Sequence, residues 1–391
     1  MRSHQIARRI GISAALIAAA GLAGISPGSA FAATSAATCA NWTGTAPVNP
    51  TSELDVFDAV ATPSPCSAWA VGNYKSSGVY KTLVEHWNGT HWTFMLSASP
   101  GGFTRDSFLT GVTAARGAKP WAVGYYNNGI ASQTVIESPK NGLWLTVPSP
   151  DPGGPHNDNV LTAVAATSAT RAWAVGWYST GASLLTLVER WNGTSWRQVP
   201  SPNPGAGNNE LYGVAAISAK DAWAVGLSTN SQGQAKTLIL HWNGASWKRV
   251  RSPNPAAQAR LNSVTETSAS NAWAVGEQTN NGTWQPLAEH WNGRSWKSVR
   301  APSPSPNVPS LLYGVTATSP GSAWAVGYSG ASGAEQTLIE HWNGRTWRRT
   351  PSPSPGTAAL LFGVASSRTS IWAVGYYGSS FPLQTLAVHC C

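Results

Sequence analysis

Short apolar runs separated by turn residues recur along most of the chain. The clearest example covers residues 211–251, where each run is rich in β-branched or aromatic side chains and is bounded by Gly, Asn, Ser or Pro. The runs are Leu211–Ser218, Ala222–Leu227, Thr237–Trp242 and Ser246–Arg251. Runs of this length and composition are typical of β-strands. The segment therefore predicts four consecutive strands.

The second of these predicted strands carries the tetrad Trp-Ala-Val-Gly, which occurs seven times. Its Trp stands at positions 69, 121, 173, 223, 273, 324 and 372, so successive copies are 48 to 52 residues apart. A fixed period of about 50 residues marks a unit that buries its apolar face only by stacking on its neighbours. Four antiparallel strands per unit, seven times over, predict an all-β fold, a seven-bladed β-propeller.

The two ends of the chain predict how the ring closes. The seventh unit supplies only three strands, ending at Thr385–His389, whereas Asn41–Gly44 near the N-terminus resembles the phrase that precedes a fourth strand. An N-terminal strand that completes the last blade would remove two exposed sheet edges.

The four cysteines are Cys39, Cys66, Cys390 and Cys391, and strand direction predicts that all four share one face. An exported chain with an even number of cysteines is expected to oxidise. Of the three possible pairings, a bond between the adjacent Cys390 and Cys391 would close a strained ring. The favoured pairing joins Cys39 to one of the terminal pair and Cys66 to the other.

Residues 1–32 have the features of a secretory signal peptide. Three arginines precede the apolar stretch 10–25, and Ala30–Ala32 fits a small-residue cleavage site. Arg8 and Arg9 leave a twin-arginine signal open as the alternative. Residues 33–391 are then expected to form one secreted, monomeric propeller domain, without a later apolar segment of the roughly 18 residues that a membrane span needs.

Most residues with candidate chemistry are repeated, which favours structural roles. Of the 21 Trp, 18 occupy three repeat positions, where they are expected to pack blade against blade. Glu-His pairs such as Glu85-His86 stand on a strand, so their side chains should point to opposite faces. The sequence holds no HExxH or Cys-pair metal spacing. Neither a cofactor, a metal nor a catalytic residue is therefore expected.

The charged residues are few, only 10% of the chain, with a net charge of +9. Basic residues gather on the predicted fourth strands: Arg197, Lys248, Arg249, Arg251, Lys297, Arg300, Arg345, Arg348 and Arg349. Cations on an open edge discourage aggregation, and the alternative is an anion-binding belt. Nucleic acid is not expected as the partner of an exported protein.

Two variable sets remain as candidate sites. One is the inner-strand ring of Asp58, Thr110, Thr162, Tyr212, Asn262, Tyr313 and Phe362, whose single acid is poor material for glycoside hydrolysis. The other set lies where the loops between the second and third strands begin, on the face that also carries the Pro-rich connections, which we call the long-loop face. Its aromatic residues, the predicted binding site, are Tyr74, Tyr125, Tyr126, Trp177, Tyr178, Tyr328, Tyr376 and Tyr377.

The recurrent phrases Ala-Trp-Ala-Val-Gly, Thr-Leu-Ile-Glu-His-Trp-Asn-Gly-x-x-Trp and Val-Pro-Ser-Pro resemble a repeat of secreted bacterial β-propellers over residues 39–391. In architecture that family is similar to kelch and galactose-oxidase-like propellers, although the Gly-Gly doublet of kelch is missing. The resemblance implies fold and export, and no activity. Because Tyr and Trp beside small polar groups suit glycans and protein epitopes alike, the expected function is non-catalytic binding of extracellular or cell-wall carbohydrate. The alternatives are a protein-interaction scaffold and a carbohydrate-active enzyme.

Overall fold

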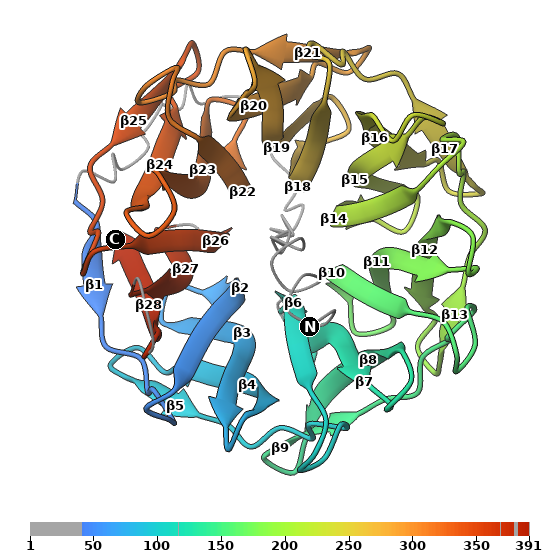
Figure 1. The fold of residues 1–391 in the computed structure, drawn as a ribbon, viewed down its shortest axis with the longest axis vertical. Coiled ribbons are helices and arrows are strands. Elements are labelled where there is room, and N and C mark those ends of the chain that lie inside the picture. The colour runs from blue at the N-terminus through green and yellow to red at the C-terminus, as the bar shows by residue number, and fades with distance from the viewer. Residues whose placement is uncertain (1–40, 116, 368, 379–381, 391) are drawn as a thin grey trace, which may run out of the picture.

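The computed structural model describes residues 41–115, 117–367, 369–378 and 382–390. They form a ring of seven four-stranded antiparallel sheets around a central axis (Figure 1). The prediction of a seven-bladed all-β propeller is confirmed. Figure 1 also shows that the first strand of each blade lies nearest the axis and the fourth lies at the rim.

The blades are numbered along the chain, and the strands of each blade follow one another from axis to rim. Blades 1 and 2 are β2 (Leu54–Ser64), β3 (Ser67–Ser76), β4 (Val79–Trp87), β5 (Trp92–Phe94) and β6 (Ser107–Thr113), β7 (Trp121–Asn127), β8 (Ser132–Lys140), β9 (Leu143–Thr146). Blades 3 and 4 are β10 (Asn159–Ser168), β11 (Arg171–Ser179), β12 (Leu184–Trp191), β13 (Trp196–Gln198) and β14 (Asn209–Ser218), β15 (Asp221–Thr229), β16 (Ala235–Trp242), β17 (Trp247–Val250).

Blades 5 and 6 are β18 (Ala259–Ser268), β19 (Asn271–Asn280), β20 (Thr283–Trp291), β21 (Trp296–Val299) and β22 (Ser310–Ser319), β23 (Ser322–Ser329), β24 (Gln336–Trp342), β25 (Trp347–Thr350). Blade 7 is β26 (Ala359–Ser366), β27 (Ile371–Tyr377), β28 (Gln384–Cys390) and β1 (Thr43–Thr45).

The glycine of each Trp-Ala-Val-Gly tetrad faces a β-bulge in the first strand. In blade 4 the pairing shifts register between Leu211 and Gly213, opposite Gly226. A Cβ on Gly226 would lie 1.9 Å from the carbonyl oxygen of Glu210, and the equivalent glycines of the other blades are equally close, at 1.8–2.1 Å. Only glycine fits there, because two backbones meet without room for a side chain.

The turns agree with the predicted hairpins but differ in construction. Asn243 does not adopt the left-handed conformation of a two-residue turn. Its side-chain oxygen instead accepts hydrogen bonds from the backbone of Ala245 and Ser246, which closes a four-residue loop.

The expected long loops of blades 1 and 5 are short, because Ser77-Gly78 and Asn281-Gly282 form tight turns with positive φ at both residues.

The N-terminal strand closes the ring as predicted. β1 pairs antiparallel with β28, with Thr43 opposite His389 and Thr45 opposite Ala387. Trp42 is buried and packs edge-on against Trp324 of blade 6, with ring centroids 5.6 Å apart. The N-terminal segment therefore supplies blade 7 with a tryptophan at the fourth-strand position, in addition to Trp372 of β27.

The cysteine pairing is confirmed in neither of its parts. Cys66 lies in the turn between β2 and β3 as a free, exposed thiol, so the expected bond from Cys66 to a terminal cysteine is wrong. The physical reason is its position on the open surface of a turn, whereas Cys390 is 2% exposed at the end of β28. Cys39 and Cys391 lie outside the described residues, and the bond from Cys39 stays a prediction.

Tryptophan contacts join each blade of the described ring to the next, as trios at five junctions and as the pairs Trp69–Trp144 and Trp324–Trp42 at the other two. Trp223 of blade 4 lies 5.0 Å from Trp291 and 5.1 Å from Trp296 of blade 5, measured between ring centroids, and the second contact is edge-on. His241 also stacks on Trp223, at 4.2 Å. In blade 3 Arg190 takes the place of His and lies over Trp173. The recurrent Trp are thus packing residues, as predicted.

The recurrent glutamates are buried between blades, on the face opposite to their neighbouring histidines. Glu85, Glu137, Glu189, Glu289 and Glu340 are all 0% exposed. Burial raises the pKa of Glu85 to about 8 and the pKa of Glu137 and of Glu289 to about 7. Serines from the preceding blade donate to two of them, as from Ser252 Oγ to Glu289 at 2.9 Å. The Glu-His pairs are therefore split structural residues and form no acid-base site.

The first prediction concerns the tryptophan trios. We expect Trp223→Ala to lower the free energy of unfolding by about 3–5 kcal/mol, because it empties a fully buried site. The control is Trp284→Ala, since Trp284 is only half-buried and lies outside the trios; it should cost less than about 1 kcal/mol. Urea denaturation followed by fluorescence measures both. Equal losses would show that the trios do not carry the packing between blades.

The second prediction concerns pH. A carboxyl group whose pKa is raised in the folded state favours the protonated form, so its contribution to stability is lost as pH rises through the folded pKa. Burial lowers the pKa of His86, His290, His341 and His389. These histidines make stability rise with pH, but only below about pH 6.5, where histidines of the unfolded chain bind protons. We therefore expect the urea midpoint to fall from about pH 7 to about pH 9, and Glu85→Gln to reduce that fall. An unchanged slope in Glu85→Gln, matching that of the surface control Glu53→Gln, would contradict the assignment.

The third prediction concerns closure. The ladder between β1 and β28 leads us to expect Cys39 in a disulfide with Cys390 or Cys391, and Cys66 reactive toward thiol reagents in the native protein. Peptide mapping without reduction, after alkylation of the native protein, measures both. Recovery of alkylated Cys39 would overturn the disulfide, and an unreactive Cys66 would overturn the free thiol.

Candidate binding site on the long-loop face

The second-to-third loops and the Pro-rich connections share one face, as the sequence predicts, although the loops of blades 1 and 5 are tight turns. In blade 4 the backbone of Thr229, at the end of β15, donates to Asn208 O at 2.8 Å, and Asn208 N donates to Thr229 Oγ1 at 2.7 Å. Asn208 belongs to the connection between β13 and β14. The second-to-third loop and the Pro-rich connection therefore hold each other at one end of the blade.

Four of the predicted binding aromatics occupy one repeat position, directly after the tetrad glycine, and pack inward. Tyr125 and Trp177 are only 6% and 5% exposed and share a core cluster with Phe108 and Val160. Tyr328 stacks on Tyr313 with ring centroids 5.9 Å apart. The fourth, Tyr376, lies 5.7 Å from Phe362. Tyr125 and Trp177 offer no free ring face for a sugar to stack on.

The other four predicted aromatics occupy the next position and point to the opposite side of the second strand. Tyr74 packs edge-on against Phe94, Tyr126 packs on the core of blades 1 and 2, and Tyr377 packs on the core of blades 6 and 7. Tyr178 lines a surface hollow in blade 3. The eight aromatics thus occupy two repeat positions in five of the blades and do not gather into one site.

A polar cluster of blades 4 and 5 lies beside the axis. Arg260 forms an ion pair with Glu277, which is 1% exposed, and Asn262 donates to the same carboxylate at 2.6 Å. The Tyr212 hydroxyl donates to Glu210 at 2.7 Å. Burial raises the pKa of Glu277, while Arg260 opposes that rise. Arg260 also lies over the Tyr212 ring, 6.0 Å from its centroid, so the cluster joins two blades and its groups already have partners.

The inner-strand ring also serves closure around the axis. The Thr162 hydroxyl lies 2.9 Å from the carbonyl oxygens of Val175 and Leu211, and so connects blade 3 to blade 4. Asn262 makes the corresponding bond to Leu312 of blade 6. Asp58 is the one acid of the ring, and burial raises its pKa to about 8. A lone, largely protonated carboxyl group is not the carboxylate pair that glycoside hydrolysis commonly uses.

In five blades a repeated hydroxyl bond holds the Pro-rich connection against the third strand, and in blade 7 Thr385 bonds Asn49 instead. In blade 4 Thr237 Oγ1 lies 2.5 Å from Ser252 Oγ, and in blade 3 Thr186 Oγ1 lies 2.7 Å from Ser201 Oγ. Blades 1, 2 and 6 have the same bond. The partners are always 15 residues apart. The bond was not predicted, and this constant spacing is the signal in the sequence that could have revealed it.

Three surface hollows follow this contact in successive blades, between the outer strands and the Pro-rich connection. The blade 3 hollow, of about 330 Å³, is lined by Tyr178, Gln198 and Asn203 among others. The blade 4 hollow has about 440 Å³ and includes Arg249 and Arg251. The blade 5 hollow is the largest of the three, at about 530 Å³. The hollows could not be predicted from the sequence, because they arise from backbone path more than from residue type.

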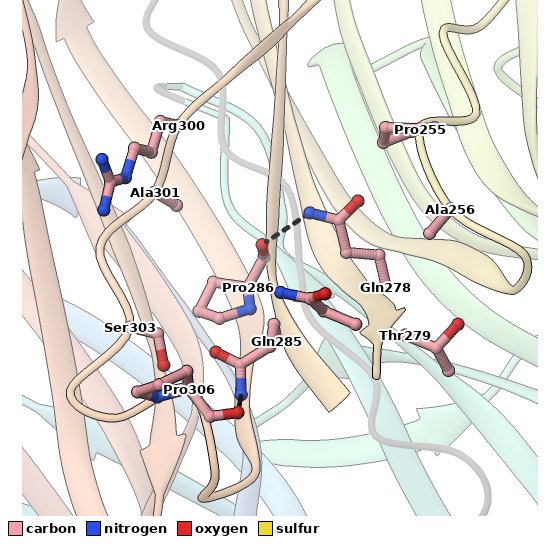
Figure 2. A pocket seen from close by; sticks show the side chains of 11 residues that line it. Pro255, Ala256, Gln278, Thr279, Gln285, Pro286, Arg300, Ala301, Ser303 and Pro306 are labelled. Atoms are coloured by element: carbon pink, nitrogen blue, oxygen red, sulfur yellow. Dashed lines mark hydrogen bonds between the residues drawn. The ribbon is translucent and has the colours of Figure 1, made fainter. Parts of the chain in front are cut away.

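Blade 5 departs from the repeat where its hollow lies. Pro286 replaces the threonine and Ala301 replaces the serine, so the hydroxyl bond is missing and both residues line the hollow. Figure 2 shows the amides of Gln278 and Gln285 beside them, with Arg300 on the opposite wall. Gln278 donates to Pro286 O at 3.4 Å. The wall thus presents amide, hydroxyl and guanidinium groups, which suit neutral or anionic hydrogen-bonding ligands.

Comparison with known proteins supports the fold and assigns no family. No protein-family model matches the chain, and no curated protein matches it. A solved structure described as "YCF48 bound to D1 peptide" aligns with a TM-score of 0.53 and 14% sequence identity, covering 90% of this chain and 95% of that chain. At this identity the likeness concerns the propeller architecture alone.

Membrane-spanning helices and clustered metal ligands are both missing from the described part of the chain. Across those ranges no helix is long and apolar enough to cross a membrane. Within the same residues, His, Cys, Asp and Glu do not gather into a group of three or more that could hold a metal ion.

Proposed function

We propose that the protein is a secreted, non-catalytic binding module for an extracellular glycan, and that the blade 5 hollow is its principal site. The observation that carries the proposal is the paired loss of the repeat's hydroxyl bond at Pro286 and Ala301, in the blade with the largest of the three hollows. A position released from its structural bond can serve a ligand instead. Export rests on the signal-like residues 1–32.

The chemistry of the hollow favours sugar hydroxyls. Gln278, Thr279, Asn280 and Ser303 offer both donors and acceptors, while the prolines give flat apolar surface. Similar hollows in blades 3 and 4 would allow a chain of sugars to be held at several points, which raises affinity through effective concentration.

The second candidate function is peptide binding. The solved propeller that this chain resembles is described as bound to a peptide, and amide groups also suit a peptide backbone. The proline-rich, hydroxyl-lined hollows and the signal-like N-terminal segment favour the glycan.

The fourth prediction tests the hollow. We expect Gln278→Ala to weaken binding of the best ligand from a glycan array about fivefold, the equivalent of one lost hydrogen bond of about 1 kcal/mol. Calorimetric titration measures the affinity. The control is Gln258→Ala, because Gln258 is an exposed amide of the neighbouring connection and lies outside the hollow. Equal affinities for both variants would reject the site, and binding confined to a peptide array would reject the glycan.

A further inference from the structure

One repeat position carries a cation in four successive blades. The residue directly after the fourth-strand tryptophan is Arg197, Lys248, Lys297 and Arg348 in blades 3 to 6, and we call these four residues the cationic row. All four are exposed. Figure 1 shows their strands, β13, β17, β21 and β25, following one another along the rim.

The charge of the cationic row is not compensated locally. The ion pairs among the described residues are Lys75 with Glu53, His241 with Asp221, and Arg260 with Glu277, none of which includes the row. The four strands that carry it contain neither Asp nor Glu. The row therefore carries an uncompensated positive field, which attracts anions along this arc of the rim.

Protection of the sheet edges does not account for this distribution. Every blade has an outer strand, yet the equivalent positions in blades 1, 2 and 7 are Thr93, Leu145 and Thr43. The outer strand of blade 2 is partly covered, since Trp144 N donates to Leu96 O at 2.9 Å, but the outer strands of blades 1 and 7 carry threonine where blades 3 to 6 carry a cation. A role confined to four adjacent blades points to a ligand that runs along them.

We propose that the rim of blades 3 to 6 binds an anionic glycan, a linear chain that carries carboxylate or phosphate groups at regular intervals. A row of cations set one blade apart matches a polymer with repeated charges. Arg251 and Arg300 line the hollows of blades 4 and 5, so the rim is continuous with the hollows. The inference rests on the proposed function, since one polymer would occupy both.

The experiment compares two variants with equal loss of charge. One is Lys248→Gln, Lys297→Gln, Arg348→Gln in the cationic row. The control is Lys119→Gln, Lys140→Gln, Arg171→Gln, three exposed cations of blades 2 and 3 outside the row. Binding to polygalacturonate, to poly(glycerol phosphate), to a neutral glucan and to duplex DNA is measured by calorimetry at about 50 and about 250 mM NaCl, a range over which screening differs strongly.

We expect the row variant to bind at least one of the two anionic polymers at least about tenfold more weakly than the wild type, and the control variant to bind it within about twofold. Wild-type binding should also weaken at least about tenfold at the higher salt concentration, because the contacts are screened. The carboxylate and phosphate arms show which anion is preferred.

Other results would overturn the inference or separate it from the proposed function. Equal losses of affinity in both variants would mean that binding depends on the total charge of the protein and not on the cationic row. Stronger binding of duplex DNA would make the row a nucleic-acid surface. Equal binding of neutral and anionic polymers, with no effect of the row variant, would remove the inference and leave the proposed function intact. Loss of anion binding in the row variant without any effect of Gln278→Ala would keep the rim and reject the hollow. Absence of binding to every polymer would reject both.

Discussion

Packing of tryptophan across the gaps between blades is the interaction on which the rest of this structure depends. Each blade presents a second-strand indole to aromatic groups of the next blade, so no blade can bury its own core alone. The ring must therefore close, and Trp324 obtains its partner from Trp42 at the other end of the described chain. The two ends are consequently tied within one blade by the need to complete a single packing contact.

This constraint also decides where a ligand can bind. The gaps between blades are filled by indoles, histidines and buried glutamates, and the groups beside the axis bind one another, as Arg260 binds Glu277. Carboxyl groups inside the ring are held in low-dielectric surroundings that favour their protonated form. The rim and the long-loop face remain available to a ligand. The fourth strand of each blade pairs only with the third strand, and the connections of the long-loop face lie at the end of the blade and not between blades.

The repeat explains why the fold could be predicted and the site could not. The strand, turn and tryptophan signals each recur five to seven times and carry the same information, and closure followed from one missing strand. By contrast, Trp177 and Tyr178 are adjacent aromatics in the same strand, yet Trp177 is covered by neighbours while Tyr178 lines a hollow. Strand alternation predicts opposite faces, but which face has room depends on the neighbouring blade and on the path of the Pro-rich connection. Cys66 shows the same limit, because sharing a face did not bring it to a partner.

In a ring of equivalent units, a departure from the repeat has a physical meaning that a single sequence position lacks. Pro286 and Ala301 change together, and together they remove both hydroxyl groups of the repeated bond. The cationic row lies on four adjacent blades that include this one. The loss of the hydroxyl bond in blade 5 and the gain of uncompensated charge thus fall on the same arc of the ring. That coincidence is why we assign the asymmetric, and hence ligand-specific, part of the molecule to blades 3 to 6.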